Sequence, residues 1–143
     1  MFDPSVKQDV IDRINKLTAE TQRKWGKMDV SQMLAHVQLP IKCAYGTHEV
    51  KGSFILKLLG PLFKGVLYNE KPYKQSLPTD PTYVIVDSKQ FDSEKQNLLE
   101  LVNKFAPENV VLLKHPVWGK MTKDQWSKAT WKHLDHHLKQ FGV

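Results

Sequence analysis

Apolar residues recur at helical spacing in four stretches of the chain, and each stretch has signals that start or stop helices. The stretches cover about residues 3–18, 30–44, 92–105 and 123–141. Asp3 precedes a proline, a pattern that predicts an N-cap with proline at the first helical position. Asp29 and Gln32 have the spacing of a capping box, and Asp92 or Ser93 is expected to cap the third helix.

Residues 46–81 form a long connection between the second and third of these helices. Within it, residues 52–68 are apolar and basic, and we expect two short helical pieces hinged at Gly60 and Pro61. Such a stretch can touch a membrane surface, but a lid or a packed crossover is the favoured interpretation. Residues 82–86 form a short extended run, an edge strand at most. The pattern predicts an all-α fold: a four-helix bundle with a long crossover between helices 2 and 3.

The tetrapeptide Trp-Gly-Lys-Met occurs twice, at residues 25–28 and 118–121, and a helix start follows each copy. After the second copy, Thr122 and Gln125 again have the spacing of a capping box. We interpret both copies as one local structure, in which a packed tryptophan and a turn at glycine lead into a capped helix.

The last helix divides into three sectors when it is wound at about 100° per residue. The charged sector is expected to face water and contains Lys128, Lys132, Asp135 and Lys139. The apolar sector is expected to face the core and contains Trp131, Leu134, Leu138 and Phe141. The third sector lies beside the apolar one and contains Trp126, Thr130, His133, His137 and Gln140. Two imidazoles therefore lie four residues apart on the inner edge of an amphipathic helix.

This histidine pair is the strongest chemical signal in the sequence. Residues i and i+4 of a helix have Cβ atoms about 5–6 Å apart, so His133 and His137 can reach one ion at metal–nitrogen distances of about 2.0–2.1 Å. His36 has a similar inner-border position on the second helix. Three imidazoles and a water would leave the open position that catalytic metal sites keep. The alternative is that the histidines are structural and hydrogen-bond to neighbours.

Other residues are candidates for the surroundings of such a site. Gln140 lies one turn after His137 and could orient a ligand or a water. Thr130 and Trp126 are expected to line the cavity or the core. Cys43 could face the cavity, although a small buried thiol is the more common role, and His115 could overhang the site from a loop. Two further histidines, His48 and His136, are expected at the surface.

Composition narrows the class of protein. The chain has 143 residues, 41% of them hydrophobic and 25% charged, which fits one ordinary globular domain over residues 1–143. No apolar run is long enough to span a membrane, and no secretory signal precedes the first helix. The single cysteine excludes an internal disulfide and a Cys-rich zinc site, and it suits the cytoplasm.

The net charge of +6 comes from lysines scattered along the chain, so it predicts solubility and no specific nucleic-acid binding. There is no HExxH zincin motif, no Glu-x-x-His pair of a di-iron bundle, no P-loop and no GxGxxG or GxSxG motif.

Several phrases of the sequence resemble the DinB/YfiT-like superfamily. They are His36 on helix 2, the pair His133 and His137 followed by Gln140, and the segments 25–36 and 132–143. The resemblance extends over essentially the whole chain and points to a branch of unassigned function. It implies a four-helix bundle that binds a divalent metal, usually nickel or zinc, through three histidines. It also implies thiol-dependent transferase or isomerase activity with bacillithiol or mycothiol, or metal-dependent hydrolysis. Leu138 and Lys139 stand where many relatives have Arg-Gly, which leaves the pocket and the substrate open.

The leading hypothesis is thus a mononuclear three-histidine metal protein of the cytoplasm, a hydrolase or thiol-dependent transferase for a small molecule. The first rival is a non-catalytic bundle, dimerising or binding a partner, with structural histidines. The second is a module that binds a membrane surface or nucleic acid through the basic residues 53–68. A homodimer is compatible with exposed aromatic residues on a small bundle.

Overall fold

A computed structural model gives the fold, and it describes residues 1–52, 54–77 and 81–143, without the side chains of residues 54–56. The described residues form five α-helices, three short 3₁₀ helices and one hairpin. The α-helices are α1 (Pro4–Asn15), α2 (Val30–Ala44), α3 (Phe54–Phe63), α4 (Phe91–Asn103) and α5 (Lys123–Gln140). The 3₁₀ helices are η1 (Lys64–Leu67), η2 (Pro81–Tyr83) and η3 (Pro107–Asn109). Strand β1 (Lys114–His115) pairs antiparallel with β2 (Gly119–Lys120). The all-α class is confirmed.

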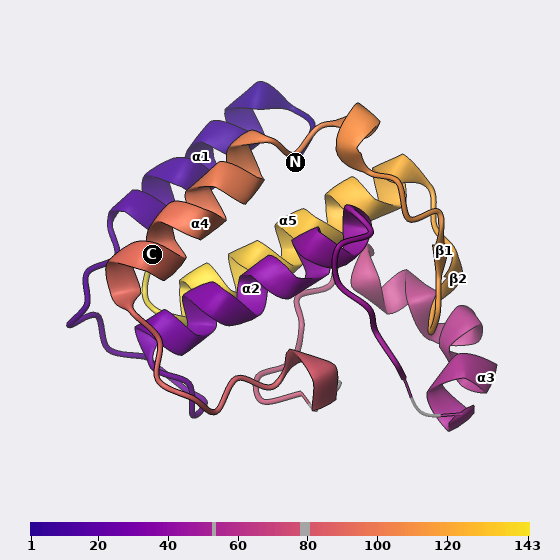
Figure 1. Cartoon of the computed structure of the whole chain (residues 1–143), viewed down its shortest axis with the longest axis horizontal. Helices are drawn as coiled ribbons and strands as arrows, with labels where there is room; N and C mark the ends of the chain where they lie inside the picture. Colours follow the sequence, from indigo (N-terminus) through magenta and orange to yellow (C-terminus); the bar gives the residue numbers. More distant parts are fainter. Residues whose placement is uncertain (53, 78–80) are drawn as a thin grey trace.

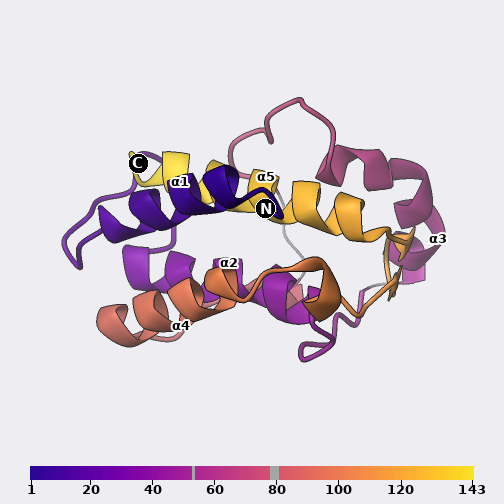
Figure 2. The same cartoon turned by 90° about the horizontal axis from the view of Figure 1, so that it is seen from above.

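Four of the helices pack around a common core. Figure 2 shows α1 and α5 in one layer and α2 and α4 in the other, and each helix contacts a neighbour in its own layer and one in the opposite layer. Each contributes a fully buried aliphatic residue: Ile14, Leu34, Leu98 and Leu134. Helix α3 and η1 lie in the connection between α2 and α4, at one end of the molecule (Figure 1). This layout agrees with the expected long crossover, whereas the DinB/YfiT bundle type stays a prediction.

Helix starts follow the capping rules at three places. Asp3 caps α1, with Pro4 in the first turn, and its carboxylate accepts hydrogen bonds from the backbone of Ser5 and Val6. Reciprocal capping boxes open α2 at Asp29 and α5 at Thr122. Each Trp-Gly-Lys-Met copy therefore leads into a capped helix, as the sequence pattern predicts.

Three local expectations are wrong. Helix α4 begins at Phe91, so Asp92 lies inside its first turn, where a carboxylate still favours the positive helix end. Helix α3 runs through Gly60 and Pro61, and the break comes after Phe63. Gly60 serves close packing, since an added Cβ would overlap the backbone of Val117. The run expected to be extended over residues 82–86 begins inside η2, so its first residues form a 3₁₀ turn.

The surface of α5 also differs from its helical-wheel sectors. Trp131 is 39% exposed, although it belongs to the predicted core sector, whereas Lys132 is only 5% exposed. The Lys132 ammonium donates to the carbonyl of Val66 at 2.6 Å and to Asn69 Oδ1 at 2.7 Å, and it lies 4.4 Å from the centroid of the Tyr73 ring. The crossover covers this side of α5, which no periodicity within α5 can reveal.

Candidate metal centre

Three histidines from two helices meet in the interior of the molecule. His36 of α2 and His133 of α5 have their Nε2 atoms 3.2 Å apart. The His137 ring lies 4.7 Å, centroid to centroid, from both of the others. One ring nitrogen from each histidine lies within 4.8 Å of the other two. The three residues predicted as metal ligands are thus brought together.

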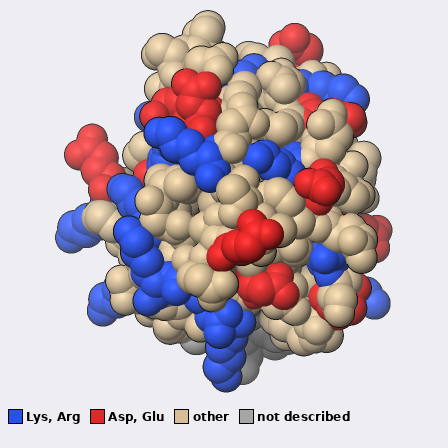
Figure 3. All heavy atoms as spheres, turned by 90° about the vertical axis from the view of Figure 1, so that its left-hand side faces the viewer, with Lys and Arg blue, Asp and Glu red and all other residues tan. Residues whose placement is uncertain are grey.

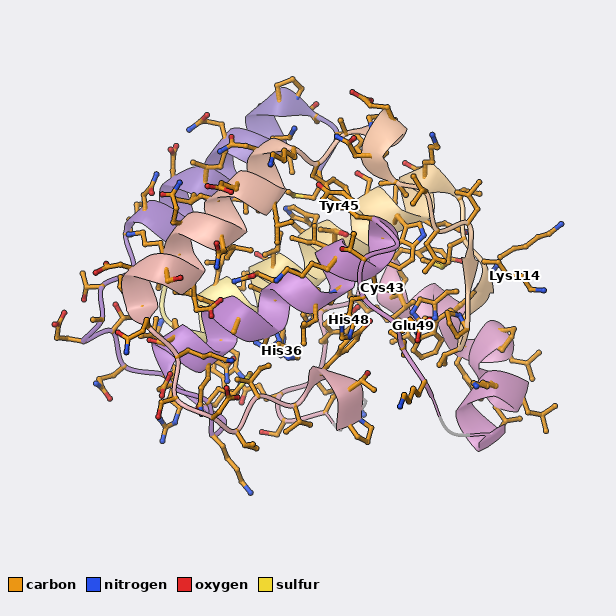
Figure 4. The ribbon with its side chains drawn as sticks, in the orientation of Figure 1. His36, Cys43, Tyr45, His48, Glu49 and Lys114 are labelled. Carbon is orange, nitrogen blue, oxygen red and sulfur yellow. The ribbon has the colours of Figure 1, made fainter. Side chains whose placement is uncertain are left out.

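The two helices explain why these residues meet. Helix α2 packs against α5 in the opposite direction, so one residue of α2 can face two successive turns of α5 (Figure 1). His133 and His137 are four residues apart and share one face of α5. On α2, His36 and Cys43 are two turns apart (Figure 4), on the side that carries the buried stripe of the helix.

Hydrogen bonds fix the tautomers of two of the three histidines. His36 Nδ1 lies 2.8 Å from the carbonyl oxygen of Tyr83, an acceptor only, so this nitrogen carries the proton and donates it. His137 Nδ1 lies 2.8 Å from Gln140 Oε1. The amide of Gln140 is oriented in turn, because its Nε2 donates to the Trp25 carbonyl at 2.8 Å. Both histidines therefore present an unprotonated Nε2, the arrangement that outer partners impose on metal-binding imidazoles.

The distance between His36 and His133 fits one small ion. Ligand nitrogens about 2.0–2.1 Å from a tetrahedral ion lie about 3.3 Å from one another. The His36 Nε2 to His133 Nε2 distance of 3.2 Å is close to that value. Without an ion, the same contact requires the proton of His133 to lie on Nε2 and to be donated to His36. The geometry alone accommodates both an ion and this hydrogen bond.

The site holds its imidazoles neutral. Burial lowers the pKa of His36. Burial, followed by the proximity of His137 and His36, lowers the pKa of His133 well below its usual value. Burial and the nearby His36 lower the pKa of His137 to about 3. Neutral imidazole is the form that binds metals, so the ligands need no deprotonation near pH 7.

The remaining candidates divide into two groups. Gln140 orients His137, as predicted. Thr130 is buried one turn before His133, and its Oγ1 has no hydrogen-bond partner among the described residues. Cys43 is fully buried, hydrogen-bonds the side chain of Tyr83, and has its pKa raised to about 11 by burial. It therefore stays a protonated thiol.

Trp126 and His115 are not part of the centre. The Trp126 indole donates to the carbonyl of Leu112 at 2.6 Å and belongs to the core. His115 packs against the ring of Trp126, which lies about two helical turns before His133 on α5. The Nδ1 atom of His115 accepts a hydrogen bond from the backbone N–H of Val117 at 3.0 Å. It stabilises the hairpin and does not overhang the histidines.

His136 and His48 are only partly exposed, so the surface prediction was too simple. The His136 ring lies 5.0 Å from the His137 ring and lines a cavity of about 180 Å³. Tyr73 and Lys132 also line this cavity, so it reaches within one ring of a ligand. The His48 ring packs at 5.6 Å from the Tyr83 ring (Figure 4).

Sequence reasoning missed two contributors. Tyr83 positions His36 through its carbonyl and Cys43 through its side chain. A residue in a 3₁₀ helix as short as η2 gives no periodic signal that would place it there. Gly26 lies against Gln140, and a Cβ added to it would overlap Gln140 Nε2. The repeated Trp-Gly-Lys-Met phrase was the available signal, but it indicated only a turn.

One of the comparisons with known proteins finds a family. The profile of a family described as "Protein of unknown function (DUF1569)" matches residues 5–142. The chain belongs to the DUF1569 family. No curated protein and no solved structure matches this DUF1569 chain. Among the described helices, none combines the length and apolar character needed to cross a bilayer.

Proposed function

We propose that this DUF1569 chain binds one divalent metal ion through Nε2 of His36, His133 and His137. The observation that supports it best is the convergence of three neutral imidazoles, two of which have their Nδ1 atoms occupied by the Tyr83 carbonyl and Gln140. Outer partners of this kind direct the other nitrogen toward an ion. An all-imidazole set suits zinc, nickel, copper and iron, whereas carboxylate-rich sites favour magnesium or calcium, and the resemblance to the DinB/YfiT-like superfamily points to zinc or nickel among these.

The ligand set defines the chemistry that the site supports. A divalent ion held by three neutral ligands keeps its full charge and supplies Lewis-acid chemistry at an open position. The histidines hold the ion without adding negative charge, and Gln140 keeps the His137 ring in one orientation. The unpartnered Thr130 hydroxyl lies one turn away and could bind a polar atom of a ligand.

We further propose that the centre acts on a small molecule, as a hydrolase or as a transferase that uses a low-molecular-weight thiol. The proposal extends the resemblance to the DinB/YfiT-like superfamily and its four-helix bundle. The metal-capable cluster of the described residues contains histidines only. Activation of a thiol or water substrate would therefore depend on the ion and not on a carboxylate base within this cluster.

The rival is a non-catalytic bundle in which His133 donates a structural hydrogen bond to His36. The 3.2 Å contact fits such a bond, so the two readings differ in metal content and not in geometry. The test is the metal content of tag-free protein by mass spectrometry, before and after reconstitution with zinc or nickel. The variant is His133→Ala/His137→Ala, and the matched control is His136→Ala, which removes a neighbouring imidazole of the same helix.

The proposal expects close to one equivalent of metal in the parent and in His136→Ala, and none in the double variant. A parent that stays metal-free after reconstitution would favour the structural rival. Full metal content in His36→Ala would show that the ligand set is different. If the metal binds as expected, thiol-transfer and hydrolytic substrates are compared on metal-loaded and chelator-treated protein. Equal activity in both would contradict a metal-dependent reaction.

A further inference from the structure

The end of the molecule that carries α3 combines exposed apolar side chains with lysine. Helix α3 and η1 expose Leu58, Leu59, Leu62, Phe63 and Val66, of which Leu62 is 77% exposed. The chain leading from η3 into the hairpin adds Val111 and Leu113. Single exposed apolar residues are ordinary, but a group of this size on one helix and its neighbour marks an interaction surface.

The packing of α3 explains why its large side chains remain outside. Its contact with the hairpin is made through small and cyclic residues, since Gly60 lies against Val117 and Pro61 lies against Gly119. Lys64 fastens the end of the helix by donating to the carbonyl of Lys120 at 2.9 Å. Leu58, Leu59, Leu62 and Phe63 therefore contribute little to the core that α1, α2, α4 and α5 share.

The segments at this end are rich in lysine. Residues 50–68 and 110–123 contain six lysines and no Asp or Glu: Lys51, Lys57, Lys64, Lys114, Lys120 and Lys123. The whole chain has 21 Lys and Arg against 15 Asp and Glu, and the acidic residues nearest to these two segments in the sequence are Glu49, Glu70, Glu108 and Asp124. Lys114 projects away from the body at this end (Figure 4). The opposite face mixes both signs (Figure 3).

We propose that this end, formed by α3, η1 and the β1–β2 hairpin, binds the surface of an anionic phospholipid bilayer. Lysine beside leucine and phenylalanine on a short helix is typical of segments that lie in the membrane interface. The ten residues of α3 span about 15 Å, half of the apolar thickness of about 30 Å, so the helix lies along the surface and does not cross it.

Charge and composition favour a lipid surface over the other occupants. A second copy docking through the same face would bring two sets of six lysines together, and like charges repel. Protein interfaces are depleted in lysine and enriched in aromatic residues, methionine and arginine, whereas the exposed side chains named here include one aromatic residue, Phe63, among leucine, valine and lysine. Anionic headgroups complement the lysines while the acyl boundary accepts the apolar side chains.

The test is flotation of the full chain with vesicles of equimolar phosphatidylglycerol and phosphatidylcholine, beside vesicles of phosphatidylcholine alone. The expected result is binding to the anionic vesicles only, weakened by salt. Leu62→Ser should reduce partitioning about tenfold or more, since a leucine leaves the apolar boundary. The matched control is Val86→Ser, which changes a residue 82% exposed outside the proposed surface and should leave partitioning unchanged.

A second pair of variants separates local charge from total charge. Lys57→Glu/Lys114→Glu and Lys16→Glu/Lys104→Glu have the same net charge, but only the first pair lies at the proposed surface. The first should weaken binding to anionic vesicles at least about 25-fold, and the second much less. Equal losses would show non-specific attraction by net charge and would overturn the proposal, as would absence of binding. A dimer in solution that Leu62→Ser dissociates would assign the face to a second copy instead.

Discussion

Gly26 offers the sharpest test of how the metal centre is held in place. It has a positive φ of 84° and touches the end of the Gln140 side chain, so Gly26→Ala adds a methyl group that overlaps Gln140 Nε2. Gln140 must move, and its bond to the Trp25 carbonyl at 2.8 Å is lost. The His137 ring then loses the acceptor that fixes its tautomer. The expected consequence is weaker metal binding, caused by a change at a residue that does not itself contact a proposed ligand.

The magnitude follows from the contacts. Loss of an outer partner of a metal-binding histidine typically weakens metal affinity about 10–100-fold, or about 1.4–2.7 kcal/mol. Alanine at a positive φ adds a conformational cost of about 1–2 kcal/mol to folding. Gly119, the glycine of the second Trp-Gly-Lys-Met copy, is the matched control. It has a φ of 69°, but an added Cβ would meet only Pro61 at an ordinary 3.5 Å.

The assay is competition for zinc against a chromophoric chelator, with thermal unfolding of the metal-free proteins beside it. Both variants should lose similar stability from backbone strain, whereas only Gly26→Ala should bind zinc more weakly. Gln140→Ala should reproduce the loss, and the double variant should add little to it, because both act through one hydrogen bond. Zinc affinities of Gly26→Ala and Gly119→Ala that agree within twofold would refute the reasoning.

The other predictions concern protons, the crossover and the thiol. The metal-free protein should lose stability as the pH falls below about 6.5, because the imidazole of His137 binds a proton in the unfolded chain but not in the folded one, where its pKa is about 3. The free energy of unfolding should fall by about 1.4 kcal/mol per pH unit for each such histidine, as measured by urea unfolding at several pH values. A flat profile would show that the imidazoles are accessible to protons in the folded state. Lys132→Ala should destabilise the fold by about 2–3 kcal/mol, because the Val66 carbonyl and Asn69 Oδ1 lose a charged donor and the buried Lys132 side chain loses its packing. Lys128→Ala on the exposed side of α5 should change the free energy of unfolding by less than about 0.5 kcal/mol, and equal effects of the two variants in chemical denaturation would contradict the buried role of Lys132. Cys43 should resist alkylation at pH 8 in the native state and react after unfolding, because the thiol is buried and its pKa is raised to about 11. Labelling is followed by mass spectrometry, and rapid labelling of the native protein would show that the thiol is open to solvent.

Sequence rules correctly predicted the features that depend on residues within a single helix. The caps at Asp3, Asp29 and Thr122 depend on residues within one turn, and all of them form as expected. The spacing of His133 and His137, with His36 on an inner border, was enough to predict which residues meet, because helical periodicity fixes the face of a side chain.

Errors arose where distant segments meet. Lys132 looks solvent-facing on a helical wheel, but the crossover supplies acceptors for its ammonium from residues 66 and 69. Gly60 looks like a hinge, but the constraint on it is the backbone of Val117, more than 50 positions away. Tyr83 could not be assigned to the centre, since its role depends on its carbonyl, which every residue type possesses.

The proposed metal ligands lie far apart in the sequence, so they are synthesised at different times. His36 and His133 are 97 positions apart, and α3 and α4 lie between α2 and α5 in the sequence. A ribosome releases α2 long before α5, and one imidazole on a nascent helix is a weak ligand. On the proposed function, an ion can be captured only after α2 and α5 have met, so metal uptake would follow the packing of these two helices. A translation product that stops before α5 would bind no ion at this site, and bound metal would mark the chains in which α2 and α5 are packed together.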